Sequence, residues 1–336
     1  MRIGFFELEK WEEEFARKNL PKHDLYFSPG KISDDSLPAQ KDLEIVSIFV
    51  NSRITKKVLD SLPNLKMVTT NSTGFDHIDV AACKARGVAV GYVPGYGNNT
   101  VAEFAFGLIL NLTRKIYQAI DQVKERESFS LDGLRGVDLK GKTIGVIGTG
   151  RIGKEMIKIA KGFGMDVVAF DLFRDVVAAK DLGFIYLALS DLLKQSDVIS
   201  VHCPLTKETQ HLINMKNVSL IKKGAYFVNT ARGPIVETAA LVWALQNGTL
   251  AGAGLDVLEE EGEIKDEMKF FADGKPHEKE LRVILETHIL MRMPNVLITP
   301  HNAFNSNEAL MRILNTTMEN ITGFIAKSQN PKNFVA

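Results

Sequence analysis

The sequence is poor in cysteine, has no excess of charge of either sign, and lacks long apolar runs. Its two cysteines, Cys83 and Cys203, form no Cys-x-x-Cys pair, so neither a disulfide scaffold nor a metal site is predicted. Lys plus Arg and Asp plus Glu both total 41, which argues against nucleic acid or an anionic membrane as partner. No apolar run approaches the roughly 20 residues that span a bilayer, and Glu7 comes too early for a secretory signal. We therefore expect a soluble, cytoplasmic protein.

The 336 residues are enough for about two domains. Short β-branched runs alternate with amphipathic segments along the whole chain, which is typical of parallel sheets covered by helices. The runs are continuously apolar, as expected for sheets buried on both faces. The predicted strands are residues 2–6, 44–50, 66–70, 143–147, 167–170, 198–201, 226–229 and 296–299.

Turn residues crowd positions 92–99, and we place a domain boundary there. Thr100 and Glu103 have the spacing of a helix capping box, so a helix is predicted to begin at this point. Pro300 marks a second break, after which the chain is expected to return to the first domain. The predicted domains are residues 1–98 with 301–336, and residues 99–300.

A glycine-rich turn follows the apolar run 143–147. Gly148, Gly150 and Gly153 have the Gly-x-Gly-x-x-Gly spacing, and a helical pattern begins at once. Such glycines allow a tight turn, close approach of a pyrophosphate and close packing of helix on strand. Asp171 ends the next strand at about the expected 20-residue spacing, where a carboxylate binds both ribose hydroxyls. NAD is therefore favoured over NADP, although Arg174 nearby leaves a 2′-phosphate possible.

Three further strand ends carry groups suited to acid–base chemistry: Arg232, the run Glu259 to Glu261, and His301. Ligands bind outside the carboxyl ends of strands in open parallel sheets. A guanidinium can hold a carboxylate in two places, and an unperturbed imidazole titrates near pH 6.5. Taken singly, Arg232 and the glutamates could be solvated surface charges, and His301 a satisfied histidine. The residues alone do not choose among the three glutamates.

The chain resembles the D-isomer-specific 2-hydroxyacid dehydrogenase family over nearly its whole length, most closely the D-lactate dehydrogenase branch. The similar stretches are 73–79, the glycine turn, 202–204, 230–233, 255–257 and 299–301, and within the branch Tyr96, 171–174 and 301–304. The resemblance implies a Rossmann-type cofactor domain and a flavodoxin-like substrate domain with a cleft between them. Phe104 departs from it, since the family often has histidine there.

Carried over by position, the family's catalytic residues fall on Arg232, Glu261 and His301. The cofactor positions that it implies, besides the glycines, are Arg151, Ile152, Asp171, Cys203, Pro204, Thr230, Ala231, Asp256 and Val101. The substrate positions that it implies, besides Arg232, are Thr73, Gly74, Phe49, Tyr96 and Phe304.

The sequence thus predicts NAD-dependent reduction of a 2-oxo acid, pyruvate first, to the D-2-hydroxy acid, and the reverse reaction. Phenylpyruvate, 2-oxoisocaproate, hydroxypyruvate or phosphite would be alternative substrates. An NAD-sensing regulator resembling the C-terminal-binding co-repressors is an alternative of another class. The resemblance also implies a homodimer formed through the cofactor domain.

Overall fold

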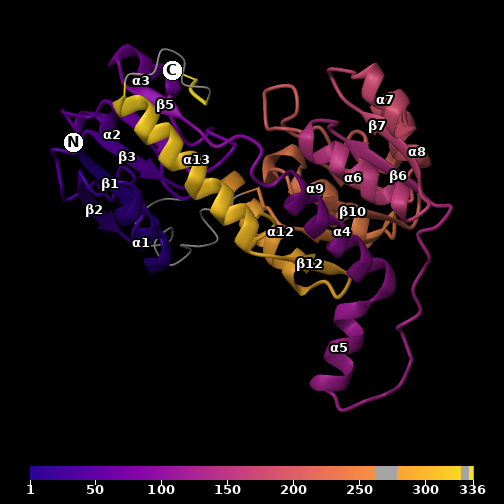
Figure 1. The fold of residues 1–336 in the computed structure, drawn as a ribbon. Coiled ribbons are helices and arrows are strands. Elements are labelled where there is room, and N and C mark those ends of the chain that lie inside the picture. Colours follow the sequence, from indigo (N-terminus) through magenta and orange to yellow (C-terminus); the bar gives the residue numbers. More distant parts are fainter. Residues whose placement is uncertain (260, 262–277, 327–332, 336) are drawn as a thin grey trace. The chain divides into compact units, whose positions relative to one another are not determined.

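The computed structural model describes residues 1–259, 261, 278–326 and 333–335; of 278–280 it describes only the backbone. The chain divides into two compact units, shown in Figure 1. One consists of Met1–Tyr96 with Ser306–Ala336, and the other of Gly97–Asn305. With these bounds, His301 and Phe304 belong to the second unit. Among the described residues, no helix has the length and apolar character needed to cross a membrane.

The first unit contains a five-stranded parallel sheet with the strand order β2-β1-β3-β4-β5. This is the doubly wound order of flavodoxin-like domains. The strands are β1 (Arg2–Phe6), β2 (Asp24–Ser28), β3 (Ile45–Ile48), β4 (Met67–Thr70) and β5 (Ala89–Gly91).

Both faces of this sheet are buried. Phe5 and Met67 face the helices α1 and α13, whereas Phe6 and Val68 belong to the core under α2 and α3. Apolar side chains on both faces explain why the strands read as continuous apolar runs. In Figure 1 the yellow α13 lies along the indigo and violet strands. The helices are α1 (Lys10–Asn19), α2 (Lys56–Asp60), α3 (Val80–Ala85) and α13 (Asn307–Ile325).

The second unit contains a seven-stranded parallel sheet with the order β12-β11-β10-β9-β6-β7-β8. Counted from β6, this is the Rossmann order 3-2-1-4-5-6 with one strand added. The strands are β6 (Thr143–Ile147), β7 (Asp166–Phe170), β8 (Ile185–Tyr186), β9 (Val198–Val201), β10 (Ala225–Asn229), β11 (Leu250–Leu255) and β12 (Val296–Ile298).

Helices cover this sheet on both faces as well. The helices α4 and α6 share one core with Ile144 and Val146, and α8 and α9 share the other with Ile199 and Phe227. The α-helices are α4 (Asn98–Arg114), α5 (Ile116–Lys124), α6 (Arg151–Gly162), α7 (Val176–Leu182), α8 (Leu189–Gln195), α9 (Thr238–Gln246) and α12 (Glu278–Arg292). Two 3₁₀ turns are η1 (Val218–Leu220) and η2 (Gly233–Ile235).

The predicted α/β class with two doubly wound parallel sheets is confirmed. The capping box is wrong, because α4 begins at Asn98 and its N-cap is Gly97, which leaves Thr100 inside the first turn. Glu103 instead accepts a hydrogen bond from the Asn99 side chain, 3.0 Å away. The turn-rich sequence thus enters the helix three residues earlier than the side-chain spacing indicates.

Candidate active site

The glycine-rich turn joins β6 to α6 at the carboxyl edge of the second sheet. Gly148 has φ +96°, and a Cβ there would lie 2.4 Å from the backbone nitrogen of Cys203. A Cβ on Gly153 would lie 1.9 Å from the carbonyl oxygen of Gly148, whereas one on Gly150 would meet nothing within 4 Å. Two of the glycines are therefore required by close packing, and Gly150 leaves the N-terminus of α6 open to a ligand. Backbone N–H groups at such an end favour an anion.

Asp171 follows β7 directly and lies beside this turn. Its Oδ2 accepts hydrogen bonds from the Thr149 backbone nitrogen at 2.6 Å and from Thr149 Oγ1 at 3.0 Å, and its Oδ1 accepts from Phe173 N at 2.9 Å. These hydrogen bonds hold the Asp171 carboxylate in one orientation, as is needed for a group that accepts hydrogen bonds from ribose hydroxyls. The Arg174 guanidinium lies 5.8 Å above the Tyr186 ring, and the Arg174 side chain is exposed.

The remaining predicted cofactor positions lie around the same edge of the sheet. Thr230 Oγ1 is buried and has no hydrogen-bond partner among the described residues, so it is available to a bound polar group. Burial raises the pKa of the Cys203 thiol to about 12, which keeps it neutral. Arg151 and Ile152 form the first turn of α6, Pro204 and Ala231 follow β9 and β10, and Val101 lies in α4. An open glycine turn, a fixed acid and an unpaired hydroxyl fit a dinucleotide.

Arg232 lies in a short turn after β10. Asn229, buried at the end of that strand, donates from Nδ2 to the Arg232 carbonyl oxygen at 3.0 Å and accepts from Ala231 N at 3.0 Å. Arg232 itself donates from Nη1 to the Ala231 carbonyl oxygen at 2.8 Å. The buried amide therefore sets the shape of the turn that carries the half-buried arginine.

His301 and Glu261 lie against one another. The imidazole Nδ1 is 3.2 Å from both carboxylate oxygens, and the two side chains are 22% and 25% exposed. The sequence separates them by 40 positions, and the fold joins them because β11 and β12 are neighbouring strands. Since Nδ1 faces the acid, the ring presents Nε2 for proton transfer.

Asp256 holds the segment that carries His301. It is 1% exposed and accepts hydrogen bonds from Thr299 Oγ1 at 2.5 Å, Asn302 N at 2.8 Å and Ala303 N at 2.8 Å. Burial raises the pKa of its carboxyl, while these donors and His301 oppose the rise. Asp256 was predicted as a cofactor residue; the contacts that the structure describes are with the His301 segment.

The segments carrying Arg232 and Glu261 also touch. A Cβ on Gly233 would lie 2.0 Å from the carbonyl oxygen of Leu258, so the two backbones are in direct contact. The predicted catalytic residues thus follow three adjacent strands, β10, β11 and β12.

Four of the predicted substrate positions lie in the first unit. Thr73 Oγ1 donates to the Val93 carbonyl oxygen at 2.8 Å, and the Gly74 carbonyl oxygen accepts from Ser72 Oγ at 2.6 Å. Phe49 N donates to Glu7 Oε2 at 3.2 Å, and the Tyr96 carbonyl oxygen accepts from Arg312 Nε at 2.6 Å. Phe304 lies in the second unit, three residues after His301.

Sequence reasoning missed the supporting polar groups. Asn229 and Thr149, both nearly fully buried, and Glu7 were not predicted to have a role. Glu7 directly follows β1, Thr149 lies two residues after β6, and Asn229 is the last residue of β10. A polar residue in that position is the signal by which these groups could have been found.

A Rossmann-ordered sheet with an open glycine turn at its switch point, and a fixed acid after the neighbouring strand β7, is the arrangement of a dinucleotide-binding domain. Residues 106–303 match the family model described as the D-isomer specific 2-hydroxyacid dehydrogenase, NAD binding domain. The chain belongs to the D-isomer-specific 2-hydroxyacid dehydrogenases, a family of NAD-dependent oxidoreductases. The predicted family, enzyme class and cofactor are confirmed.

Relatives with full-length coverage support this assignment. The chain is 38% identical to 2-hydroxyacid dehydrogenase A of Aspergillus oryzae over 97% of this chain and 93% of that protein. It is 34% identical to D-lactate dehydrogenase of Escherichia coli over 100% of both chains. A solved structure, D-lactate dehydrogenase of Aquifex aeolicus with NAD and lactic acid, superposes with a TM-score of 0.87 at 37% identity, covering 99% of this chain and 98% of that one.

Proposed function

We propose that this enzyme reduces pyruvate to D-lactate with NADH, and that Arg232, Glu261 and His301 are its catalytic residues. The observation that carries the proposal is the contact of His301 Nδ1 with both oxygens of Glu261 at 3.2 Å. An acid-oriented imidazole is the group that a carbonyl reduction needs as proton donor. The full-length similarity to D-lactate dehydrogenases supports pyruvate as the first candidate substrate.

The roles follow from the chemistry of each group. Arg232 binds the substrate carboxylate through its planar fork of donors. NADH, when bound, supplies the hydride that reaches C2 of the 2-oxo acid. His301 donates its proton from Nε2 to the oxo oxygen, and Glu261 keeps the ring oriented and stabilises its charged form. In the reverse reaction His301 takes the hydroxyl proton.

The two units have different parts in the proposal. The second unit, with the glycine turn and Asp171, binds NAD. The first unit binds the substrate through the backbone at Thr73 and Gly74 and through the side chains of Phe49 and Tyr96. Phe304 is the proposed aromatic contact from the second unit. These substrate contacts are inferred by position from the family.

A substrate panel tests the proposal. NADH oxidation is followed at 340 nm with pyruvate, phenylpyruvate, 2-oxoisocaproate, hydroxypyruvate and glyoxylate, and NADPH is run in parallel. The highest kcat/KM is expected for pyruvate with NADH, and the product should be the D isomer by chiral chromatography. A higher value for a bulkier acid would overturn pyruvate, and NADH binding without turnover of any acid would overturn the catalytic roles.

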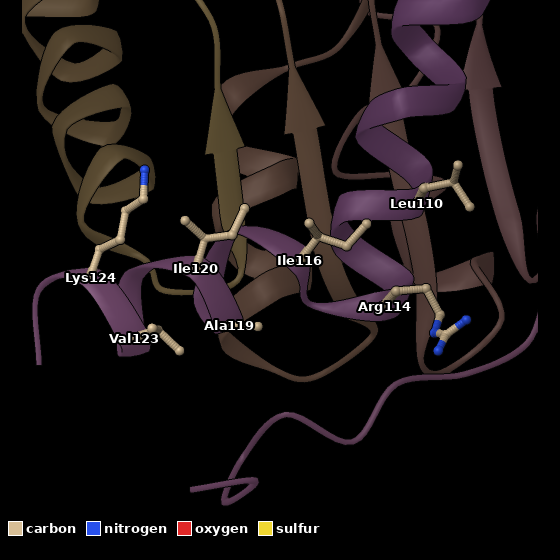
Figure 2. Close-up of a pocket in the computed structure, with 7 residues that line it drawn as sticks. All are labelled: Leu110, Arg114, Ile116, Ala119, Ile120, Val123 and Lys124. Carbon is tan, nitrogen blue, oxygen red and sulfur yellow. The ribbon is translucent and has the colours of Figure 1, made fainter. Parts of the chain in front are cut away.

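We also propose a homodimer formed through the second unit. The helix α5 exposes Ile116, Tyr117, Ile120 and Val123, with exposed fractions between 39% and 58%. Figure 2 shows the groove that Ile116, Ile120 and Val123 line together with Leu110 and Arg114 of α4. A contiguous exposed apolar surface favours association, and two copies of one surface meet about a twofold axis. We further propose a cytoplasmic location, which cell fractionation tests.

A further inference from the structure

Glu259 is a carboxylate that has no role in the proposed reaction. Its side chain is 9% exposed and accepts three hydrogen bonds. Oε2 accepts from Thr238 N at 3.0 Å and from Thr238 Oγ1 at 2.7 Å, and Oε1 lies 2.6 Å from His211 Nε2. A solvated surface charge would have no such fixed set of partners. We call His211, Thr238 and Glu259 the Glu259 cluster.

The cluster joins three segments that are distant in the sequence. Thr238 is the first residue of α9, and Glu259 lies in the segment after β11. His211 belongs to the segment between β9 and η1, and its backbone nitrogen donates to the Pro234 carbonyl oxygen at 2.8 Å. The carboxylate therefore ties the segment after β11 to the turn and helix that follow β10.

This link bears on both proposed catalytic loops. Glu261 is only two residues beyond Glu259, and consecutive Cα atoms are about 3.8 Å apart, so a fixed Glu259 restricts where Glu261 can lie. On the other side, Gly233 touches the backbone of Leu258 and Glu259, and Arg232 is its neighbour. A shift of Glu259 would therefore move Glu261, which contacts His301. It would also move the backbone against which Gly233, the neighbour of Arg232, packs.

We propose that Glu259 is a positioning residue for the reaction, and that Thr238 and His211 hold it in place. It acts through Glu261 by keeping that carboxylate within contact of His301 Nδ1. This inference rests on the proposed roles of Glu261 and His301. A misplacement of about 1 Å in a catalytic group can lower the rate about a hundredfold, so a carboxylate that never touches substrate can still set kcat.

A double-mutant cycle tests this action through Glu261. Glu259→Ala, Glu261→Gln and the double variant are assayed with NADH and pyruvate, or with the acid that the panel ranks first. We expect Glu259→Ala to lower kcat about ten- to hundredfold, with KM and the NADH Kd changed less than threefold. In the Glu261→Gln background the same change should cost less than threefold, because residues that act as one unit are not additive.

Variants of Thr238 give a second measurement if Glu259→Ala does not fold. Thr238→Val removes one donor to Glu259 and should lower kcat several-fold, whereas Thr238→Ser keeps both donors and should restore most of the rate. Glu237→Ala is the matched control: it removes the neighbouring carboxylate, which accepts from Met215 N at 2.9 Å and not from the cluster. We expect the control to change kcat less than twofold, with circular dichroism confirming the fold of each variant.

The outcomes separate this inference from the proposed function. If Glu261→Gln is slow and Glu259→Ala has wild-type kcat, only the positioning role is wrong. If the losses of Glu259→Ala and Glu261→Gln are additive, Glu259 does not act through Glu261. If Glu259→Ala instead weakens KM and NADH affinity and leaves kcat unchanged, its role is only structural. Either result would overturn the positioning role. If Glu261→Gln itself keeps full activity, the assigned role of Glu261 fails, and the positioning role fails with it.

Discussion

At the scale of single residues, the proposed proton donor itself has a strained backbone conformation. His301 has φ +55°, in the left-handed region that costs a non-glycine residue about 1 kcal/mol or more. The neighbouring N–H groups of Asn302 and Ala303 both donate to the buried Asp256. A charged acceptor makes strong hydrogen bonds, so Asp256 offsets the strain and holds the imidazole where Glu261 can reach it.

Arg232 is the residue whose loss should be most costly. Removing one partner of a buried charge pair costs about 2–5 kcal/mol, and each 1.4 kcal/mol is about tenfold. Arg232→Ala should therefore lose about 30-fold to several thousand-fold in kcat/KM for pyruvate. Steady-state kinetics measures this, with the exposed Arg86→Ala as control. Near-native activity of Arg232→Ala would mean that another group binds the carboxylate.

The charged candidates could be predicted because Arg232 and His301 each lie three residues after the end of an apolar strand. The partners of Glu259 could not be predicted, since a run of three glutamates reads as solvated charge. Only the fold brings His211, 48 positions away, and Thr238, 21 positions away, to one of the three glutamates. Asp256 was selected from the family, and its contacts with residues 299–303 depend on the pairing of β11 with β12.

At the scale of elements, strands with a continuous apolar signal were predictable, including the edge strand β12, whereas the edge strands β2, β5 and β8 and the inner strand β11 were not. Residues 143–147 and 198–201 are strands with the predicted bounds, because β-branched side chains buried on both faces leave a continuous apolar signal. The edge strands β2 and β8 lack buried residues. The strand β11 consists largely of alanine and glycine between two leucines, and glycine is depleted in strands.

The turn between β6 and α6 depends on the close approach of Gly153 to Gly148. A Cβ at Gly153 would sit 1.9 Å from the Gly148 carbonyl oxygen, so Gly153→Ala must displace the turn. Overpacking costs about 1–3 kcal/mol, and NADH affinity should fall about five- to hundredfold. Fluorescence titration with NADH measures the Kd. Gly162→Ala at the other end of α6 meets nothing within 4 Å and should leave the Kd unchanged; equal values for both variants would contradict the packing argument.

The end of β9 should make the fold sensitive to acid. Desolvation lowers the pKa of His202 from 6.5 to about 4, so the folded protein keeps this ring neutral while the unfolded chain protonates it. The stabilisation is complete above pH 6.5 and is lost as the pH falls toward 4, by at most about 3 kcal/mol at 1.36 kcal/mol per unit. Urea unfolding of the apoenzyme from pH 7 to 4.5 measures it. His202→Asn should flatten this part of the profile; an unchanged slope would assign the acid sensitivity to other groups.

At the scale of the whole molecule, the chain forms one unit from both of its ends and the other from its middle. The C-terminal α13 completes the first unit: Thr317 Oγ1 donates to Asn71 Oδ1 at 2.7 Å, and Asn320 donates to the Tyr92 carbonyl oxygen at 2.9 Å. These are contacts between segments more than 220 positions apart, which local sequence patterns do not encode. The return of the chain was inferred because Pro300 is followed by a helical pattern with no strand after it, and because the family resemblance implies a substrate role for Phe304, which lies beyond Pro300.

The apolar surface of α5 is a feature that the fold of one chain leaves exposed. Ile120 is 50% exposed and lines the groove beside α4 (Figure 2). In the proposed dimer it becomes buried, so Ile120→Glu places an unpaired charge in the interface, which costs several kcal/mol. Sedimentation velocity at micromolar concentration should show a dimer for the wild type and a monomer for Ile120→Glu. Ile185→Glu, an equally drastic change at a 60% exposed isoleucine on the edge strand β8, should remain dimeric. If both variants form dimers of equal stability, the dimer contact lies elsewhere on the molecule. If the wild type is a monomer, the proposed dimer does not form.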